Sequence, residues 1–151
     1  MQDILFNLSK IEIRYNPKIP ALQKPRIANS NDAYRQFMQL LDIERLNIQE
    51  EVAALFLNRG NRVIGGYKLG IGGITGAVVD IRIILGIALK CLATGLMLCH
   101  THPSGELKPS AADKEVTERL KQAAKLMDIS QLDHLVVTAE GYFSFEDEGI
   151  L

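Results

Sequence analysis

The stretch LCHTHPSGELKPSAAD, residues 98–113, contains two of the chain's three histidines, one residue apart, at the end of an apolar run. Successive side chains on a β-strand point to opposite faces, so His100 and His102 should project from one face of the strand GLMLCHTH, residues 95–102. Pro103 ends regular pairing there because it lacks a backbone N–H. The spacing predicts two imidazoles side by side at a strand end, which suits a single metal ion.

The start of a helix is expected after a gap of seven residues that follows His102. Ser110 is the expected N-cap of a helix running to about residue 127, and Asp113 falls at its third position. A carboxylate in the first turn lies near the positive end of the helix dipole, which keeps it ionised and helps to point it back toward the strand end. Two neutral imidazoles and one carboxylate make the three-ligand set of a catalytic zinc ion, whose fourth position is left to water. One Zn²⁺ per chain is therefore predicted.

Hydrolysis at such a site also needs a base that accepts a proton from water and passes it to the leaving amine. Glu50 and Glu51 open the apolar strand EEVAALFLN, residues 50–58. If the strand alternates strictly, only one of the two carboxylates faces the site. Sequence spacing leaves the choice between them open.

The remaining segments predict an α/β fold with one mixed sheet and helices on its faces. The glycine-rich stretch 70–76 lacks the spacing of a phosphate-binding loop and is interpreted as a connector. The predicted elements are a strand over 8–15, a proline-rich extended arm over 16–29, a helix over about 31–43 capped by Ser30, a hairpin over 50–70 turning at 58–61, a buried helix over about 80–93, and a closing hairpin over 131–145 turning at Glu140-Gly141.

The composition of the 151 residues, 47% hydrophobic and 23% charged, is that of one soluble globular domain. A net charge of −1 provides no general attraction to nucleic acid or to an anionic membrane, although it leaves room for a local basic patch. Arg82 and Lys90 interrupt the apolar run 81–99, so no membrane span is predicted. The N-terminal residues do not resemble a signal peptide. Cys91 and Cys99 lie in apolar segments, which favours buried thiols and a cytoplasmic location.

The pattern His100-Thr101-His102, seven residues, Ser110, two residues, Asp113 resembles the HxH-x7-S-x2-D signature of the JAMM (MPN+) metallopeptidase family. Three stretches further resemble the RadC branch of that family, whose members are often described as DNA repair proteins. They are HTHPSGELKPSAAD, the later LDHLVV over residues 132–137, and LFLN over residues 55–58 with a glutamate before it. The similarity runs over about residues 50–151.

The resemblance implies a role for each matched residue. His100, His102 and Asp113 would bind zinc, and Ser110 would help to hold or polarise the substrate carbonyl. Aligning LFLN with the RadC pattern selects Glu50 as the base, with Glu51 as the fallback. The implied fold is an αβα sandwich similar to that of cytidine deaminases. The implied organisation is a JAB/MPN metal-binding domain over 50–151, on which the strand, arm and helix of 1–49 pack.

The leading hypothesis is a zinc-dependent hydrolase that cleaves a peptide or isopeptide amide. Deamination is excluded because that chemistry uses HxE or CxE with PCxxC. A nuclease-type DNA-processing enzyme and a metal-stabilised interaction module remain alternatives. The DNA connection is weaker here because residues 1–49 do not resemble the helix-hairpin-helix region that precedes the metal domain in full-length RadC proteins. Asp133 and His134 are candidates for orienting a ligand from behind, but a structural role is the favoured interpretation of His134.

Overall fold

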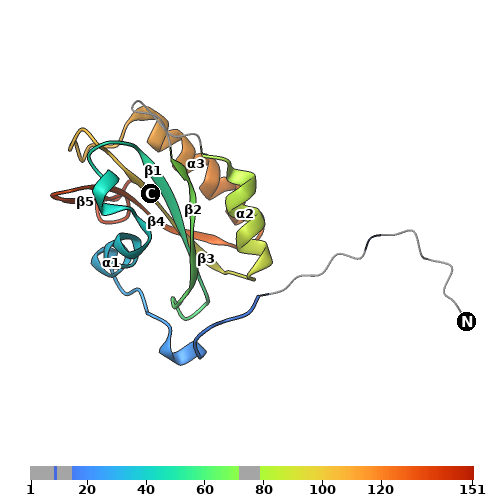
Figure 1. Ribbon diagram of the computed structural model, residues 1–151. Helices are drawn as coiled ribbons and strands as arrows, with labels where there is room; N and C mark the ends of the chain where they lie inside the picture. Colours follow the sequence, from blue (N-terminus) through green and yellow to red (C-terminus); the bar gives the residue numbers. More distant parts are fainter. Residues whose placement is uncertain (1–8, 10–14, 72–78) are drawn as a thin grey trace, which may run out of the picture.

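The structure is a computed structural model that describes residues 9, 15–71 and 79–151 (Figure 1). Apart from Ser9 and Tyr15, the strand predicted over 8–15 lies outside the described residues, as do residues 72–76 of the predicted connector.

One five-stranded sheet forms the centre of the molecule, with the strands in the order β2-β1-β3-β4-β5. Strands β3 and β4 are parallel and the other neighbours are antiparallel, so the prediction of a mixed sheet is confirmed. The strands are β1 (Glu51–Leu57), β2 (Val63–Ile71), β3 (Gly95–Thr101), β4 (Ser130–Thr138) and β5 (Gly141–Ser144).

Helices cover both faces of the sheet, which confirms the predicted αβα sandwich (Figure 1). Helix α1 (Ser30–Leu40) packs on one face through Ala33 and Phe37. Helices α2 (Ile81–Lys90) and α3 (Ala111–Lys125) pack on the other face. No helix in the described part of the chain is both long enough and apolar enough to cross a membrane.

The central strands β1 and β3 are buried along their whole length because each contributes to two cores. Leu55 and Cys99 belong to the core beneath α1, whereas Phe56 and Leu98 belong to the core beneath α2 and α3. This alternation is the period of two that a strand imposes on its side chains. It determines which face of the sheet each residue at the strand ends reaches.

Several predicted boundaries are wrong by a few residues. Helix α1 is capped by Asn29 rather than Ser30, because the Asn29 side chain accepts a hydrogen bond of 2.9 Å from the N–H of Asp32. That helix also ends at Leu40, and the backbone is extended at Leu41. The predicted arm includes a 3₁₀ turn over Ala21–Gln23, and a second 3₁₀ turn over Ile43–Arg45 precedes β1. The closing hairpin turns one residue earlier than predicted, since Thr138 pairs with Gly141.

Candidate metal centre

Strand β3 positions the two histidines. His100 follows Leu98 on the face of the sheet that α2 and α3 cover. The strand ends at Thr101, one residue earlier than predicted, but the N–H of His102 still donates to the carbonyl of Val137 at 2.9 Å. His102 therefore keeps the direction of the strand. The two rings are adjacent, with their Nε2 atoms 2.9 Å apart.

The first turn of α3 positions the carboxylate of Asp113. Ser110 is the N-cap as predicted: its Oγ accepts from the N–H of Asp113 at 3.1 Å, and its own N–H donates to Asp113 Oδ2 at 2.6 Å. This reciprocal capping box holds the carboxylate back toward the strand end. Asp113 Oδ1 lies 3.0 Å from Nε2 of His100, and Oδ2 lies 3.2 Å from Nε2 of His102.

Strand parity separates the two adjacent glutamates. Val52 pairs with His100, so Glu50, two residues earlier, shares the histidines' face of the sheet. Glu51 is fully buried on the opposite face, where its carboxylate pairs with Lys68 at 2.7 Å and accepts from the N–H of Asp42 at 3.0 Å. Glu50 itself lies just before β1, one residue outside the strand that it was predicted to open.

Thr101 holds the backbone on both sides of Glu50. Its Oγ1 accepts from the N–H of Glu51 at 2.9 Å and donates to the carbonyl of Gln49 at 3.3 Å. A loop residue such as Glu50 would otherwise have considerable freedom. These contacts tie the position of Glu50 to the end of β3, the same strand that carries the histidines.

The replacement Glu51→Gln is expected to lower the free energy of unfolding by about 1–3 kcal/mol, because it removes a buried charge from its ion pair. The loss of stability should be smaller than the loss caused by breaking a fully buried ion pair, since the Lys68 side chain is 39% exposed and can be solvated. Urea unfolding followed by circular dichroism measures the change. Glu50→Gln is the matched control and should stay within about 0.5 kcal/mol of the native protein. Equal stabilities of the two variants would contradict the assigned positions.

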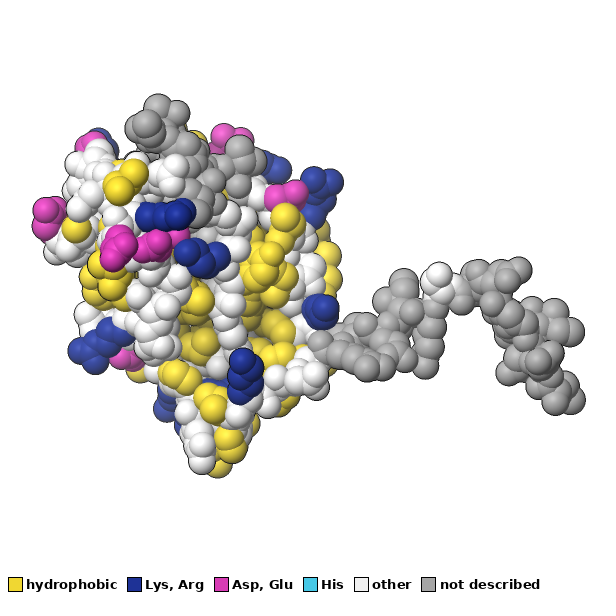
Figure 2. Space-filling view, viewed as in Figure 1, with side chains coloured by type: hydrophobic (Ala, Val, Ile, Leu, Met, Phe, Trp, Pro, Cys, Tyr) yellow, Lys and Arg dark blue, Asp and Glu magenta, His cyan; other side chains and the backbone are white. Residues whose placement is uncertain are grey.

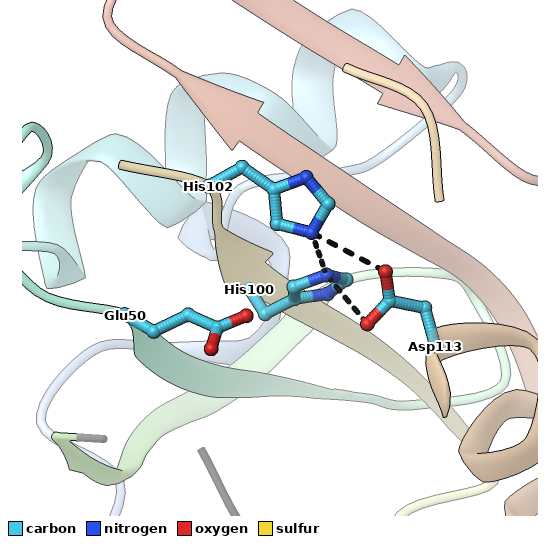
Figure 3. Close-up of side chains that lie close together, drawn as sticks. All are labelled: Glu50, His100, His102 and Asp113. Atoms are coloured by element: carbon cyan, nitrogen blue, oxygen red, sulfur yellow. Dashed lines mark hydrogen bonds and ion pairs between the residues drawn. The ribbon is translucent and has the colours of Figure 1, made fainter. Parts of the chain in front are cut away.

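Glu50, His100, His102 and Asp113 form one group, called here the four-residue cluster, in which one ligand atom from each residue lies within 4.8 Å of the others. Figure 3 shows the Glu50 carboxylate approaching the histidines from the side away from Asp113. A tetrahedral zinc ion with bonds of about 2.0–2.1 Å separates its ligand atoms by about 3.3 Å. The spacings of 2.9, 3.0 and 3.2 Å among the histidine and aspartate atoms are near that value. The donor set therefore fits one ion.

Hydrogen bonds around the cluster set the charge of its members. Burial raises the pKa of Asp113, but the hydrogen bonds with His100 and His102 outweigh it and hold this pKa far below its ordinary value. The hydrogen bond with Asp113 raises the pKa of His102 above its usual 6.5. Nδ1 of His102 donates to the carbonyl of Glu106 at 2.7 Å, because a carbonyl can only accept. When His102 is neutral, its Nε2 therefore presents a lone pair to the cluster.

His134, for which the sequence favoured a structural role, contacts the cluster directly. It lies on β4 beside Leu98 of β3, and its Nε2 is 2.7 Å from Nδ1 of His100. Its Nδ1 is 2.5 Å from Oγ1 of Thr117 on α3. Burial, and then the charge of His100, lower the pKa of His134 well below its ordinary value. The signal in the sequence for this contact was a histidine directly before the apolar run LVV of LDHLVV.

Two hollows meet at the cluster. A cavity of about 220 Å³ between the sheet and α3 is lined by residues that include Glu50, His100, Asp113 and Arg119. A more open groove of about 500 Å³ is lined by residues that include Glu50, His102, Lys108 and Ser110. Glu50 borders both hollows. A chain-like substrate lying along them would pass the cluster.

Cys99 lies on the face of β3 opposite the histidines, as predicted, and is fully buried. Burial raises the pKa of its thiol well above the ordinary value. Cys91 is half-buried and, like Cys99, is a free thiol. Neither belongs to the four-residue cluster.

Comparison with known proteins identifies related sequences. Residues 27–150 match the family described as the RadC-like JAB domain. A UPF0758 protein of Flavobacterium johnsoniae is 46% identical over 129 residues, which are 85% of this chain and 55% of that protein. A UPF0758 protein of Porphyromonas gingivalis is 38% identical over 139 residues, which are 89% of this chain and 60% of that protein. The chain thus spans a little over half the length of these relatives.

Proposed function

This chain belongs to the family of RadC-like JAB domains, and on that premise we propose that it is a zinc-dependent hydrolase of peptide or isopeptide amides. One observation carries the proposal: the carboxylate of Glu50 stands beside a three-ligand set made by His100, His102 and Asp113. Three protein ligands leave a position open, as catalytic zinc sites do, whereas structural zinc sites are closed by four.

Each residue has a defined task in the proposed reaction. His100, His102 and Asp113 hold the ion, which when bound lowers the pKa of a water molecule to about 7 and polarises the substrate carbonyl. Glu50 accepts the proton of the attacking water and delivers it to the leaving amine. Ser110 Oγ accepts the capping hydrogen bond from Asp113, so its own hydrogen is available to a substrate oxygen in the groove. Capping and assistance to the substrate are therefore compatible roles for Ser110.

An amide substrate agrees with the shape of the site. The cavity and the groove extend on two sides of the cluster, and both are bordered by Glu50. A peptide or a lysine-linked isopeptide has a chain on each side of the scissile bond, and each of the two hollows accommodates one of them. The groove side carries polar and charged side chains, among them Lys108 and Ser110, which suit the backbone of an extended peptide.

A nuclease-type role has less support from the charge distribution. The net charge is −1, and Figure 2 shows Lys and Arg side chains scattered among acidic ones on the face in view rather than gathered in a stripe. Binding to a phosphate backbone depends on a continuous basic surface. The surface in view offers no such stripe, and the open coordination position argues against a purely structural metal site.

The function is tested with the zinc-loaded protein and a set of fluorogenic peptides and ε-lysine-linked isopeptides. Zinc-dependent cleavage that is lost in His102→Ala is the expected result. Purified protein that binds no zinc would overturn the proposal. Cleavage that persists unchanged in His102→Ala would reveal a contaminating peptidase and favour the interaction-module alternative. Metal-dependent cutting of a branched DNA probe, without peptide cleavage, would favour the nuclease alternative.

Zinc affinity is expected to fall as the pH decreases from about 8 to about 6, by up to about tenfold per pH unit for one displaced proton. Zinc needs the unprotonated Nε2 of His102, and the hydrogen bond with Asp113 raises the pKa of this imidazole above 6.5. Protons therefore compete with zinc close to neutral pH. Titration against a chelator of known affinity at each pH measures the effect. An affinity independent of pH over this range would contradict it.

A further inference from the structure

The fully buried His134 connects a threonine of α3 with a histidine of the four-residue cluster. Its ring stacks on Phe145, with centroids 4.7 Å apart and planes inclined by 13°, so its orientation is fixed by packing. One ring nitrogen faces Oγ1 of Thr117 and the other faces Nδ1 of His100. The three side chains, from α3, β4 and β3, form a continuous hydrogen-bonded chain that ends at the metal site.

The direction of this chain follows from the single hydrogen of the Thr117 hydroxyl. Oγ1 of Thr117 lies 2.7 Å from the carbonyl oxygen of Asp113, which can only accept. The hydroxyl hydrogen therefore points to Asp113, and toward His134 the oxygen can only accept. Nδ1 of His134 must then carry a hydrogen. Both short contacts of Thr117 are satisfied together only in this arrangement.

The hydrogen bond at Nε2 of His134 determines that Nδ1 of His100 carries a hydrogen. A charged imidazolium that is fully buried is costly without an anion in contact, and within the described residues no carboxylate oxygen bonds the His134 ring. His134 is thus neutral, with its hydrogen on Nδ1 and a lone pair on Nε2. That lone pair accepts from Nδ1–H of His100, so whenever His100 is neutral its Nε2 is unprotonated and faces Asp113 and His102.

We propose that Thr117 and His134 are positioning residues that hold His100 in the Nδ1–H tautomer, so that its Nε2 is ready to bind the metal ion. The metal-binding part of this inference rests on the proposed function, whereas the tautomer is a property of the zinc-free protein. The carbonyl of Glu106 favours the same tautomer in His102, because it accepts a hydrogen bond from Nδ1–H of that ring. Groups behind a ligand that fix its tautomer and orientation typically contribute a factor of about 10–100 to metal affinity.

Thr117 also links two ligands. Its hydroxyl donates to the backbone carbonyl of Asp113 and accepts from His134, so one side chain contacts one ligand residue directly and acts on His100 through His134. Thr117 is itself buried on α3, one helical turn after Asp113. Removing only the hydroxyl should therefore disturb the site without altering its shape.

The first test is NMR on the zinc-free protein at about pH 8, with long-range proton–nitrogen correlations of the imidazoles. The chain has only three histidines, which simplifies assignment. The expected result is a hydrogen on Nδ1 of both His100 and His134, with Nε2 of His134 unprotonated. An Nε2–H tautomer at His100 in the wild-type protein would overturn the proposal. The measurement does not require zinc binding. It therefore tests the tautomer of His100 independently of the proposed hydrolase function.

The second test compares Thr117→Val with Thr117→Ser in zinc titrations against a chelator. Thr117→Val keeps the branched shape but loses the hydroxyl, and is expected to lose zinc affinity by about 10–100-fold and to mix the tautomers of His100. Thr117→Ser retains the hydroxyl and should bind zinc nearly as the wild type does. Equal affinities for Thr117→Val and wild type, or equal losses in both variants, would overturn the proposal.

A second pair of variants, at His134, tests the proposal if Thr117→Val folds poorly. In His134→Gln the amide oxygen can accept from Nδ1 of His100, whereas His134→Leu fills a similar volume without an acceptor. Zinc affinity should be retained better by the glutamine than by the leucine variant, with thermal unfolding measured for both. Equal zinc affinity in these two variants would contradict the positioning role proposed for His134.

Discussion

Replacing Glu50 with glutamine is expected to leave zinc bound and to lower the rate of amide hydrolysis by roughly 10²–10⁴-fold. Glutamine keeps the size and polarity of the side chain but cannot accept a proton from water at neutral pH. The three atoms that would hold the ion come from His100, His102 and Asp113 and do not depend on Glu50. Zinc content and the turnover of a cleaved peptide or isopeptide, measured on one preparation, separate the two effects.

Glu118→Gln is the matched control for this experiment. Glu118 lies on the exposed side of α3, where it pairs with Gln122, and the change removes the same charge away from the cluster. Its activity should remain close to that of the wild type. Loss of zinc in Glu50→Gln would assign Glu50 to the ligands instead, and undiminished turnover would remove it from the reaction.

The variant His100→Ala is expected to lower the zinc content from about one ion per chain to near zero. His100 is buried at the centre of the cluster, and its Nε2 contacts both Asp113 and His102. Its removal leaves two protein ligands where catalytic zinc sites have three. The loss of affinity should exceed the roughly 10–100-fold that the loss of a supporting residue causes, so it should also exceed that of Thr117→Val. Metal analysis after dialysis measures the content.

Cys99→Ala provides the comparison for His100→Ala. The thiol lies at the preceding position of β3, fully buried on the opposite face. Both changes shorten a buried side chain of the same strand, so general destabilisation affects both. Zinc should be retained in the cysteine variant alone. Zinc retained in His100→Ala would remove His100 from the ligand set.

The α/β class and the order of the described elements were predictable because they follow from local periodicity. Strands such as β3 are short apolar runs, and α3 has a capping residue at its start and an apolar stripe along its length. Boundaries were less accurate. Both Asn29 and Ser30 are good capping residues, and the choice between them was made by contacts across the fold, since the Ser30 hydroxyl bonds with Tyr142 of β5.

Within the candidate site, the juxtaposition of His100, His102 and Asp113 was accessible from the sequence. The two histidines share a face because of the strand period, and Asp113 turns back because it completes a capping box with Ser110. The contact of His134 with the cluster was not predictable in this way. Its contact with His100 requires the parallel pairing of β3 with β4, which places it beside Leu98 across 36 positions of the sequence, and no local pattern specifies that register.

The sequence by itself determined the chemistry gathered at residues 100–113, because strand parity, proline and helix capping act over a few residues. Only the tertiary structure decided what surrounds that chemistry. The antiparallel register of β1 on β3 turns Glu50 toward the histidines and buries Glu51 against Lys68. The parallel register of β4 brings His134, and the packing of α3 brings Thr117, behind His100. Such contacts depend on which strands become neighbours, and that is settled by burial of the two cores as a whole.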